Sequence, residues 1–214
     1  MTATRTRLLV TGFGPFPGIA HNPSAEIARR VAASPRWRVH AVAAEALILP
    51  TTYAALDDVL APAIAAAAPD ALLMIGVAGR STRVRIEARA LNRASILAPD
   101  AAGRRPGRLT LQGGDGARRL GQDPARLHAL VQRHGVACSI SQNAGRYLCN
   151  AAYYQALAAA IPVLFVHIPK GAAWSRRRTA AKRRRSWPDC LSGALVDVAL
   201  RLLVASRSGR DARL

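Results

Sequence analysis

Short apolar runs alternate with amphipathic stretches along most of the chain, and this alternation is typical of strands separated by helices. Apolar runs that end in glycine, proline or polar residues predict buried strands over 7–11, 37–44, 71–77, 136–140 and 162–168. A further strand is predicted over 83–90, where Val84, Ile86 and Ala88 alternate with mostly charged residues. Amphipathic stretches predict helices over 24–33, 51–67, 123–134, 146–160 and 188–204, with Ser24 as the N-cap of the first.

The order of these elements predicts the fold class. Strands that alternate with helices indicate an α/β protein, a three-layer α/β/α sandwich of the phosphorylase/hydrolase-like kind, whose mixed sheet is mainly parallel. With 214 residues, 50% of them hydrophobic, the chain can bury a core. Because neither a repeat nor a boundary interrupts it, we expect a single domain over residues 1–214. Residues 99–121, rich in glycine, proline and arginine, predict a long loop with room for a short hairpin.

The excess of basic residues leads to a hypothesis about binding partners. Lysine and arginine number 31 against 12 acidic residues, which gives a formal net charge of +19, and only Lys170 and Lys182 are lysines. Seven basic residues lie between Arg176 and Arg185, within a basic segment over 170–187 whose order the sequence leaves open. Basic runs bind phosphate polymers by releasing counterions. A nucleic-acid or polyanion binder that uses Arg176 to Arg185 is therefore one hypothesis.

The apolar stretches indicate where the protein is located, and the cysteines indicate which kinds of site it can contain. The longest apolar stretches contain prolines and fall short of the roughly 20 residues that span a membrane, and the N-terminal residues do not follow a secretory pattern. We therefore expect a cytoplasmic protein without membrane contact. Cys138, Cys149 and Cys190 are an odd number without metal-type spacing, which argues against a disulfide framework and a zinc site. No metal and no cofactor are expected.

Cys149 is the most informative of the three cysteines. It follows a polar turn between a predicted strand and a predicted helix, where helix-end amides favour a thiolate and can hold an oxyanion. A buried structural cysteine is the alternative that spacing leaves open. Cys138 and Cys190, in an apolar strand and an amphipathic helix, fit that alternative.

A thiol nucleophile needs a base and a residue that orients the base. His167 ends an apolar strand, at the edge where open α/β sheets usually build their sites, whereas His128 and His134 are expected to face solvent. Glu87, one of three glutamates, can orient an imidazole. A core histidine and a surface glutamate remain open readings of these two residues. In the proline-stiffened loop after the first strand, Phe13 and Phe16 suit a flat, partly apolar ligand.

Four segments, taken in order, resemble pyroglutamyl peptidase I, a family of cysteine peptidases that remove N-terminal pyroglutamate from peptides. They are Thr11-Gly12-Phe13-Gly14-Pro15-Phe16 with Asn22-Pro23-Ser24, Gly76-Val77-Ala78-Gly79-Arg80 leading to Glu87 and Asn92, Ala144-Gly145-Arg146-Tyr147-Leu148-Cys149-Asn150, and Phe165-Val166-His167-Ile168-Pro169. The similarity spans about residues 8–169. It implies a single pyroglutamyl-peptidase-like domain.

The resemblance also implies roles for residues. Cys149 becomes the nucleophile, His167 the general base and then acid, and Glu87 the residue that orients His167, in a reaction through a thioester acyl-enzyme without a metal. The substrate is a peptide with an N-terminal pyroglutamate, and the protein is a homodimer or homotetramer. The implied substrate pocket comprises Phe13, Phe16, Asn22, Thr51, Gly76, Val77, Tyr147 and Leu148.

The chain departs from the family pattern at several positions. Val77 stands where many members have glutamine, Leu97 where an arginine is usual, and Lys170-Gly171 where a tyrosine with an acidic or polar residue follows the histidine strand. These differences indicate a divergent member. They keep open a cysteine hydrolase or amidase of the same fold that acts on another N-acyl or lactam substrate.

Overall fold

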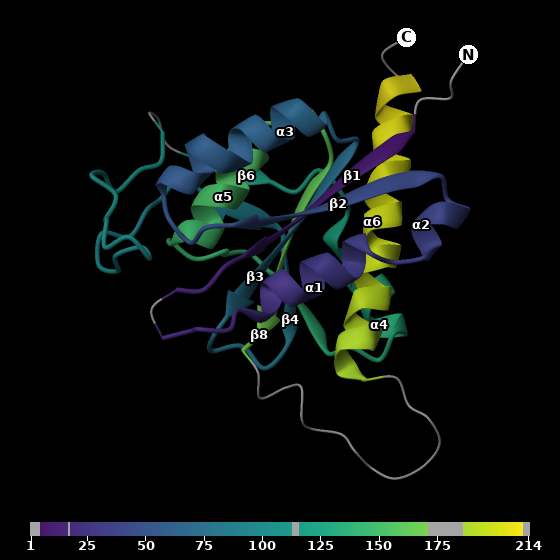
Figure 1. Ribbon diagram of the computed structural model, residues 1–214, viewed down its shortest axis with the longest axis horizontal. Coiled ribbons are helices and arrows are strands. Elements are labelled where there is room, and N and C mark those ends of the chain that lie inside the picture. Colours follow the sequence, from purple (N-terminus) through teal and green to yellow (C-terminus); the bar gives the residue numbers. More distant parts are fainter. Residues whose placement is uncertain (1–4, 17, 113–115, 171–185, 212–214) are drawn as a thin grey trace.

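A central six-stranded sheet organises the fold (Figure 1). The structure, a computed structural model, describes residues 5–16, 18–112, 116–170 and 186–211. The strand order is β2-β1-β3-β8-β4-β7, in which β2, β1, β3 and β8 are parallel, β4 is antiparallel to β8, and β7 is parallel to β4. The strands are β1 (Thr6–Phe13), β2 (Val42–Leu49), β3 (Ala71–Ala78), β4 (Val84–Glu87), β7 (Cys138–Ser141) and β8 (Val163–Pro169). The predicted mixed, mainly parallel sheet is confirmed.

Helices cover both faces of this sheet and give three layers (Figure 1). One face packs against α1 (Pro23–Ala32), α2 (Arg36–Val39), α4 (Pro124–Arg133) and α6 (Trp187–Asp211). The other packs against the π-helical turn η1 (Leu56–Leu60), α3 (Ala61–Ala67) and α5 (Leu148–Ala156). Strand β3 is apolar throughout because Leu73 and Ile75 enter the first core while Leu72 and Met74 enter the second. The predicted α/β class and its layering are confirmed.

Strand β4 explains the alternation of apolar and charged residues in its segment. Val84 and Ile86 are buried in the core beneath α4 and α6. Arg85 and Glu87 point to the opposite face, because successive side chains of a strand alternate. Beyond Ala88 the chain forms β5 (Arg89–Leu91), which pairs antiparallel with β6 (Ala117–Arg119) as a separate two-stranded sheet.

Several predicted boundaries are wrong, each for a local reason. The strand expected over 37–44 begins only at Val42, because Trp37 lies in the short helix α2 and donates its indole N–H to Val31 O at 2.6 Å. The N-cap of α1 is Asn22, whose Oδ1 accepts from the Ser24 amide at 3.1 Å, and Ser24 lies within the helix.

Two further predicted helices start later than expected. The predicted long loop contains a short strand that pairs with a strand outside the loop. The helix expected over 51–67 starts after Tyr53, whose amide donates to Asp100 Oδ2 at 2.9 Å. The helix expected over 146–160 covers only α5. Residues 99–112 and 116–121 form turns and β6, which pairs with β5 and makes no hairpin within the described part of this loop. Of the basic segment 170–187, residues 171–185 lie outside the described residues, and Arg176 to Arg185 lie among them.

None of the helices that the structure describes has both the length and the apolar character needed to cross a membrane.

Candidate active site

The loop after β1 is tied down from three directions. At Gly12 a Cβ would lie 2.6 Å from Ser24 O, so the strand approaches the start of α1 as closely as only glycine allows. The Ser24 hydroxyl accepts from the Phe13 amide at 3.0 Å. Asn22 Nδ2 and Thr51 Oγ1 both donate to Gly14 O, at 2.9 and 3.0 Å. This network fixes the segment that carries Phe13 and Phe16.

Cys149 is the second residue of α5. Its Sγ lies against β3, since a Cβ built on Gly76 would be 2.9 Å from the sulfur. The first amides of a helix have no carbonyl partner within it, and the positive end of the helix dipole favours negative charge there. The next residue, Asn150, is fully buried, and its side-chain amide bonds Leu91 N, Leu91 O and Arg93 O at 2.8–2.9 Å. Asn150 thereby holds α5 against the segment that follows β4.

His167 and Glu87 form a buried pair between neighbouring strands. His167 is 5% exposed and Glu87 is 0% exposed, and His167 Nδ1 lies 2.8 Å from Glu87 Oε1. The antiparallel register places Arg85 opposite His167 and Glu87 opposite Phe165. The Phe165 ring packs beside the imidazole, with 4.8 Å between the ring centroids.

Cys149 and Glu87 both act on the protonation of His167. Burial alone lowers the pKa of His167, but the negative charge and hydrogen bond of Cys149, together with those of Glu87, outweigh it and raise the pKa to about 9. The charge of Glu87 also reaches Tyr153, whose pKa is raised first by burial and then by this carboxylate. The raised pKa favours the imidazolium form of His167, which lies between the thiol of Cys149 and the carboxyl group of Glu87.

A small pocket of about 50 Å³ opens beside the sulfur. The residues that line it are Phe13, Phe16, Asn22, Thr51, Val77, Tyr147, Leu148 and Cys149. The structure thus brings together seven of the eight residues that the resemblance implies for the substrate pocket, and at the eighth, Gly76, an added Cβ would lie 2.9 Å from the sulfur. Asn22 and Thr51 both donate a hydrogen bond to Gly14 O, so these two side chains hold the wall of the pocket in place.

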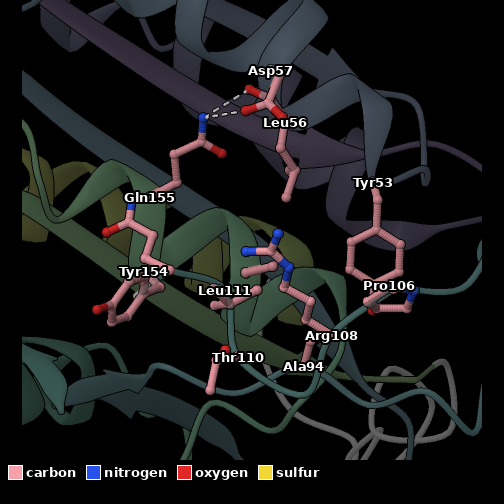
Figure 2. Close-up of a pocket in the computed structure, with 13 residues that line it drawn as sticks. Tyr53, Leu56, Asp57, Ala94, Pro106, Arg108, Thr110, Leu111, Tyr154 and Gln155 are labelled. Carbon is pink, nitrogen blue, oxygen red and sulfur yellow. Dashed lines mark hydrogen bonds between the residues drawn. The ribbon is translucent and has the colours of Figure 1, made fainter. Parts of the chain in front are cut away.

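A second, larger pocket of about 470 Å³ lies between η1, α5 and the long loop (Figure 2). It is lined by Tyr53, Leu56, Asp57, Ala94, Pro106, Gly107, Arg108, Thr110, Leu111, Gln112, Ala151, Tyr154 and Gln155. In Figure 2 the guanidinium of Arg108 lies between Gln155 and Tyr53, and Gln155 bonds Asp57 Oδ1 at 3.1 Å. Tyr53 lines the larger pocket and Tyr147 the smaller one. The two rings pack edge-on with centroids 6.0 Å apart, so this pair separates the pockets. The pKa of Tyr53 rises to about 12, mainly through burial.

Sequence patterns did not reveal how several residues support the site. Arg85, which the sequence offered only as a partner of Glu87 on a solvated strand face, contacts Glu87 Oε1 through Nε at 3.1 Å, and this carboxyl group is buried. Asn92 accepts from the amides of Leu111 and Gln112, both at 2.9 Å, and so holds the long loop. An asparagine between apolar residues, as at Asn150 between Cys149 and Ala151, is a signal that could have found such an anchor, because a buried amide must be paired.

The other candidate positions are placed as follows. Leu97 is 85% exposed and lines neither pocket. His128 and His134 are both part-buried, which corrects the expectation that they face solvent: His128 Nε2 lies 3.1 Å from Cys138 O, and His134 Nε2 lies 2.6 Å from Asp197 Oδ2. None of the three cysteines, all of which the structure describes, forms a disulfide bond. In the described part of the chain, no group of three or more His, Cys, Asp and Glu side chains is placed to hold a metal ion.

Comparisons with known proteins agree on one family. The family model described as pyroglutamyl peptidase matches residues 6–171. The pyrrolidone-carboxylate peptidase of Gloeobacter violaceus is 34% identical over 169 residues, which cover 76% of this chain and 81% of that protein. The pyrrolidone-carboxylate peptidase of Streptococcus pyogenes is 33% identical over 152 residues, covering 71% and 69%.

Solved structures give the same result. Pyroglutamyl peptidase I from Bacillus amyloliquefaciens matches with a TM-score of 0.78 and 27% identity, covering 95% of this chain and 97% of that one. The pyrrolidone carboxyl peptidase from Thermus thermophilus matches with a TM-score of 0.73 and 28% identity, covering 91% and 99%. The sequence and structural matches extend over most of the chain, and the chain belongs to the pyroglutamyl peptidase family.

Proposed function

We propose that this chain is a cysteine peptidase that removes pyroglutamate from the N-terminus of peptides, with Cys149 as nucleophile, His167 as general base and acid, and Glu87 as the residue that orients His167. The observation that carries the proposal is the alignment of a helix-terminal thiol, a buried His–Glu pair and a small aromatic pocket. Family membership supports the same activity.

The first half of the reaction forms a thioester. Cys149 Sγ, as thiolate, attacks the pyroglutamyl carbonyl carbon, and the unpaired first amides of α5 hold the negative oxygen that develops. The protonated His167 donates its proton to the leaving nitrogen as the C–N bond breaks. The shortened peptide leaves with a free amino terminus, and the pyroglutamyl group remains on the sulfur.

The second half releases the acid. Neutral His167 takes a proton from a water molecule, whose oxygen attacks the thioester carbonyl, and the C–S bond breaks to regenerate the thiolate. Throughout, Glu87 accepts from Nδ1 and keeps Nε2 directed at the reacting atoms. No step requires a metal or another cofactor.

The pocket accounts for the choice of a lactam ring. Phe13, Phe16 and Tyr147 offer flat apolar surface to the ring. The Thr51 hydroxyl and one N–H of Asn22 already donate to Gly14 O, and in this proposal backbone groups pair with the lactam N–H and C=O. Proline lacks the lactam carbonyl and would leave such a backbone group unpaired, which is costly in a buried site.

Hydrolysis of pyroglutamyl-aminomethylcoumarin tests the proposal. We expect turnover by the native chain, loss of it in Cys149→Ala, and little hydrolysis of prolyl-aminomethylcoumarin. Cys138→Ser is the matched control, because Cys138 is a buried thiol on β7, outside the pocket. A native chain that reacts with iodoacetamide at Cys149 but does not cleave the pyroglutamyl substrate would contradict the proposal and point to another N-acyl or lactam substrate.

Further features of the proposed function concern assembly and setting. We propose a homodimer or homotetramer, supported by exposed apolar side chains at Ile96, Leu97 and Leu109 that association would bury. Light scattering after size-exclusion chromatography measures the state, and a monomer at micromolar concentration would contradict it.

The cytoplasmic location and non-specific polyanion contact remain predictions. Cell fractionation tests the first. For the second, binding of a nucleic-acid probe should collapse between low and moderate salt, and on replacement of the arginines between Arg176 and Arg185 by serine.

A further inference from the structure

Glu87 shares one carboxylate oxygen between two cationic partners. Oε1 lies 2.8 Å from His167 Nδ1 and 3.1 Å from Arg85 Nε. Oε2 is buried and has no hydrogen-bond partner among the residues that the structure describes. The side chain of Glu87 is 0% exposed, whereas that of Arg85 is 30% exposed. Because a buried carboxylate is costly unless it is paired, Arg85 offsets a charge that His167 neutralises only while it is protonated.

The rest of the Arg85 guanidinium is bound to the segment that leads to the nucleophile. Its second terminal nitrogen donates to Ser141 Oγ at 2.5 Å and to Asn143 O at 2.6 Å. Ser141 ends β7, and the chain then runs through Asn143 to α5 and Cys149. A planar guanidinium can bind several acceptors in one fixed geometry, which a lysine ammonium cannot reproduce. Arg85 therefore connects the acid of the catalytic set to the loop before its thiol.

We infer that Arg85 is a positioning residue of this site: it holds Glu87 Oε1 against His167, compensates the buried carboxylate, and fixes the Ser141–Asn143 segment ahead of Cys149. The inference rests on the proposed function for its catalytic meaning, and on the geometry alone for its electrostatic meaning. None of the sequence motifs that indicated the family includes Arg85.

The effect of Arg85 on the pKa of His167 depends on the other charged and titratable groups around the imidazole. Strand β4 contributes Arg85 and Glu87. Helix α5 contributes Cys149, and also Tyr153, which senses the charge of Glu87. Strand β3 places Gly76, which has no charged group, opposite His167. Lys170, the residue after the end of β8, donates to Gly18 O. Arg85 is thus the cation directly opposite His167 in the ladder, and its removal leaves the imidazolium as the remaining cation of this group beside the Glu87 carboxylate.

The test compares Arg85→Gln with Arg89→Gln. Arg89 donates to Gln142 O at 2.6 Å, so it holds the same loop but has no contact with Glu87. The His167 imidazole is titrated by NMR in the intact chain, with its signal assigned by its loss in His167→Gln. We expect the titration midpoint to rise by about 0.5–1 pH unit in Arg85→Gln and to stay near the native value in Arg89→Gln. Arg85→Lys, which keeps the charge, should restore most of the native midpoint.

Activity supplies the second readout. The alkaline limb of kcat/KM for pyroglutamyl-aminomethylcoumarin, on which imidazolium loses its proton, should move up with the NMR midpoint in Arg85→Gln. In a Glu87→Gln background the added Arg85→Gln change should shift the midpoint far less, because the carboxylate it compensates is gone. An unchanged or lowered midpoint in Arg85→Gln, or an equal shift in Arg89→Gln, overturns the inference. The NMR titration decides the matter even if the native chain cleaves no pyroglutamyl substrate.

Discussion

Gly76→Ala is the most direct test of how closely the sheet supports the thiol. A Cβ at position 76 would lie 2.7 Å from Phe165 Cζ and 2.9 Å from Cys149 Sγ. Favourable carbon contacts lie at about 3.5–4.0 Å, so the neighbours must give way by more than about half an ångström in total. Phe165 has little room, since it is 0% exposed and packs against Tyr153 and Phe13 with centroid distances of 5.6 and 6.4 Å. The sulfur therefore takes much of the displacement.

The magnitude follows from that displacement. Overpacking a core costs about 1–3 kcal/mol, and a misplacement of about 1 Å in an active site can cost on the order of 100-fold in rate. We expect kcat for pyroglutamyl-aminomethylcoumarin to fall about tenfold or more in Gly76→Ala, with a lower Tm. Gly79→Ala is the matched control, because a Cβ there meets nothing within 4 Å. If Gly76→Ala keeps the native kcat and the native Tm, the conclusion that β3 packs directly against the sulfur is refuted.

Three further predictions follow from the same contacts. Since the folded pKa of His167 is raised to about 9 from 6.5, its contribution to stability is fully present below pH 6.5 and is lost as pH rises through 9; urea unfolding of the native chain should show this loss, and His167→Gln should not. Burial raises the pKa of Cys138 to about 11, so iodoacetamide at pH 7.5 should label Cys149 before Cys138, and mass spectrometry showing the reverse order would contradict the assignment of the nucleophile. Asn22→Ala removes the N-cap of α1 and a donor to Gly14 O, and should cost about 1 kcal/mol of stability and raise KM, whereas an unchanged KM would mean that the loop is held without Asn22.

Local patterns predicted the strands and helices that are long and strongly periodic. Strand β3 and strand β8 are apolar on both faces because each is covered by both cores, and such runs are readable from sequence. Trp37 misled the prediction because its apolar ring is buried from a helical turn, where it bonds Val31 O, and not from a strand. Strand β6 could not be found, because only its long-range pairing with β5 makes it a strand.

The candidate site was more predictable than its supports. Phe13 lies in the loop after the first predicted strand, and Cys149 follows a polar turn between a predicted strand and a predicted helix, so the pattern itself made both candidates, whereas Tyr147 was implied only by the family resemblance. The family segments include Asn92 and Asn150, but the sequence did not predict that these residues act as anchors. Asn150 and Asn92 act by bonding backbone groups of segments that are distant in sequence, and no local pattern specifies those partners.

The reversed direction of β4 explains why the acid of the site needs a second cation. In the antiparallel ladder, Arg85 lies opposite His167, and Glu87 lies one pleat deeper, opposite Phe165. The carboxylate is therefore buried completely. His167 compensates this charge only when it is protonated, whereas a guanidinium keeps its charge at every working pH. The same register that buries Glu87 places Arg85 where that permanent charge is required.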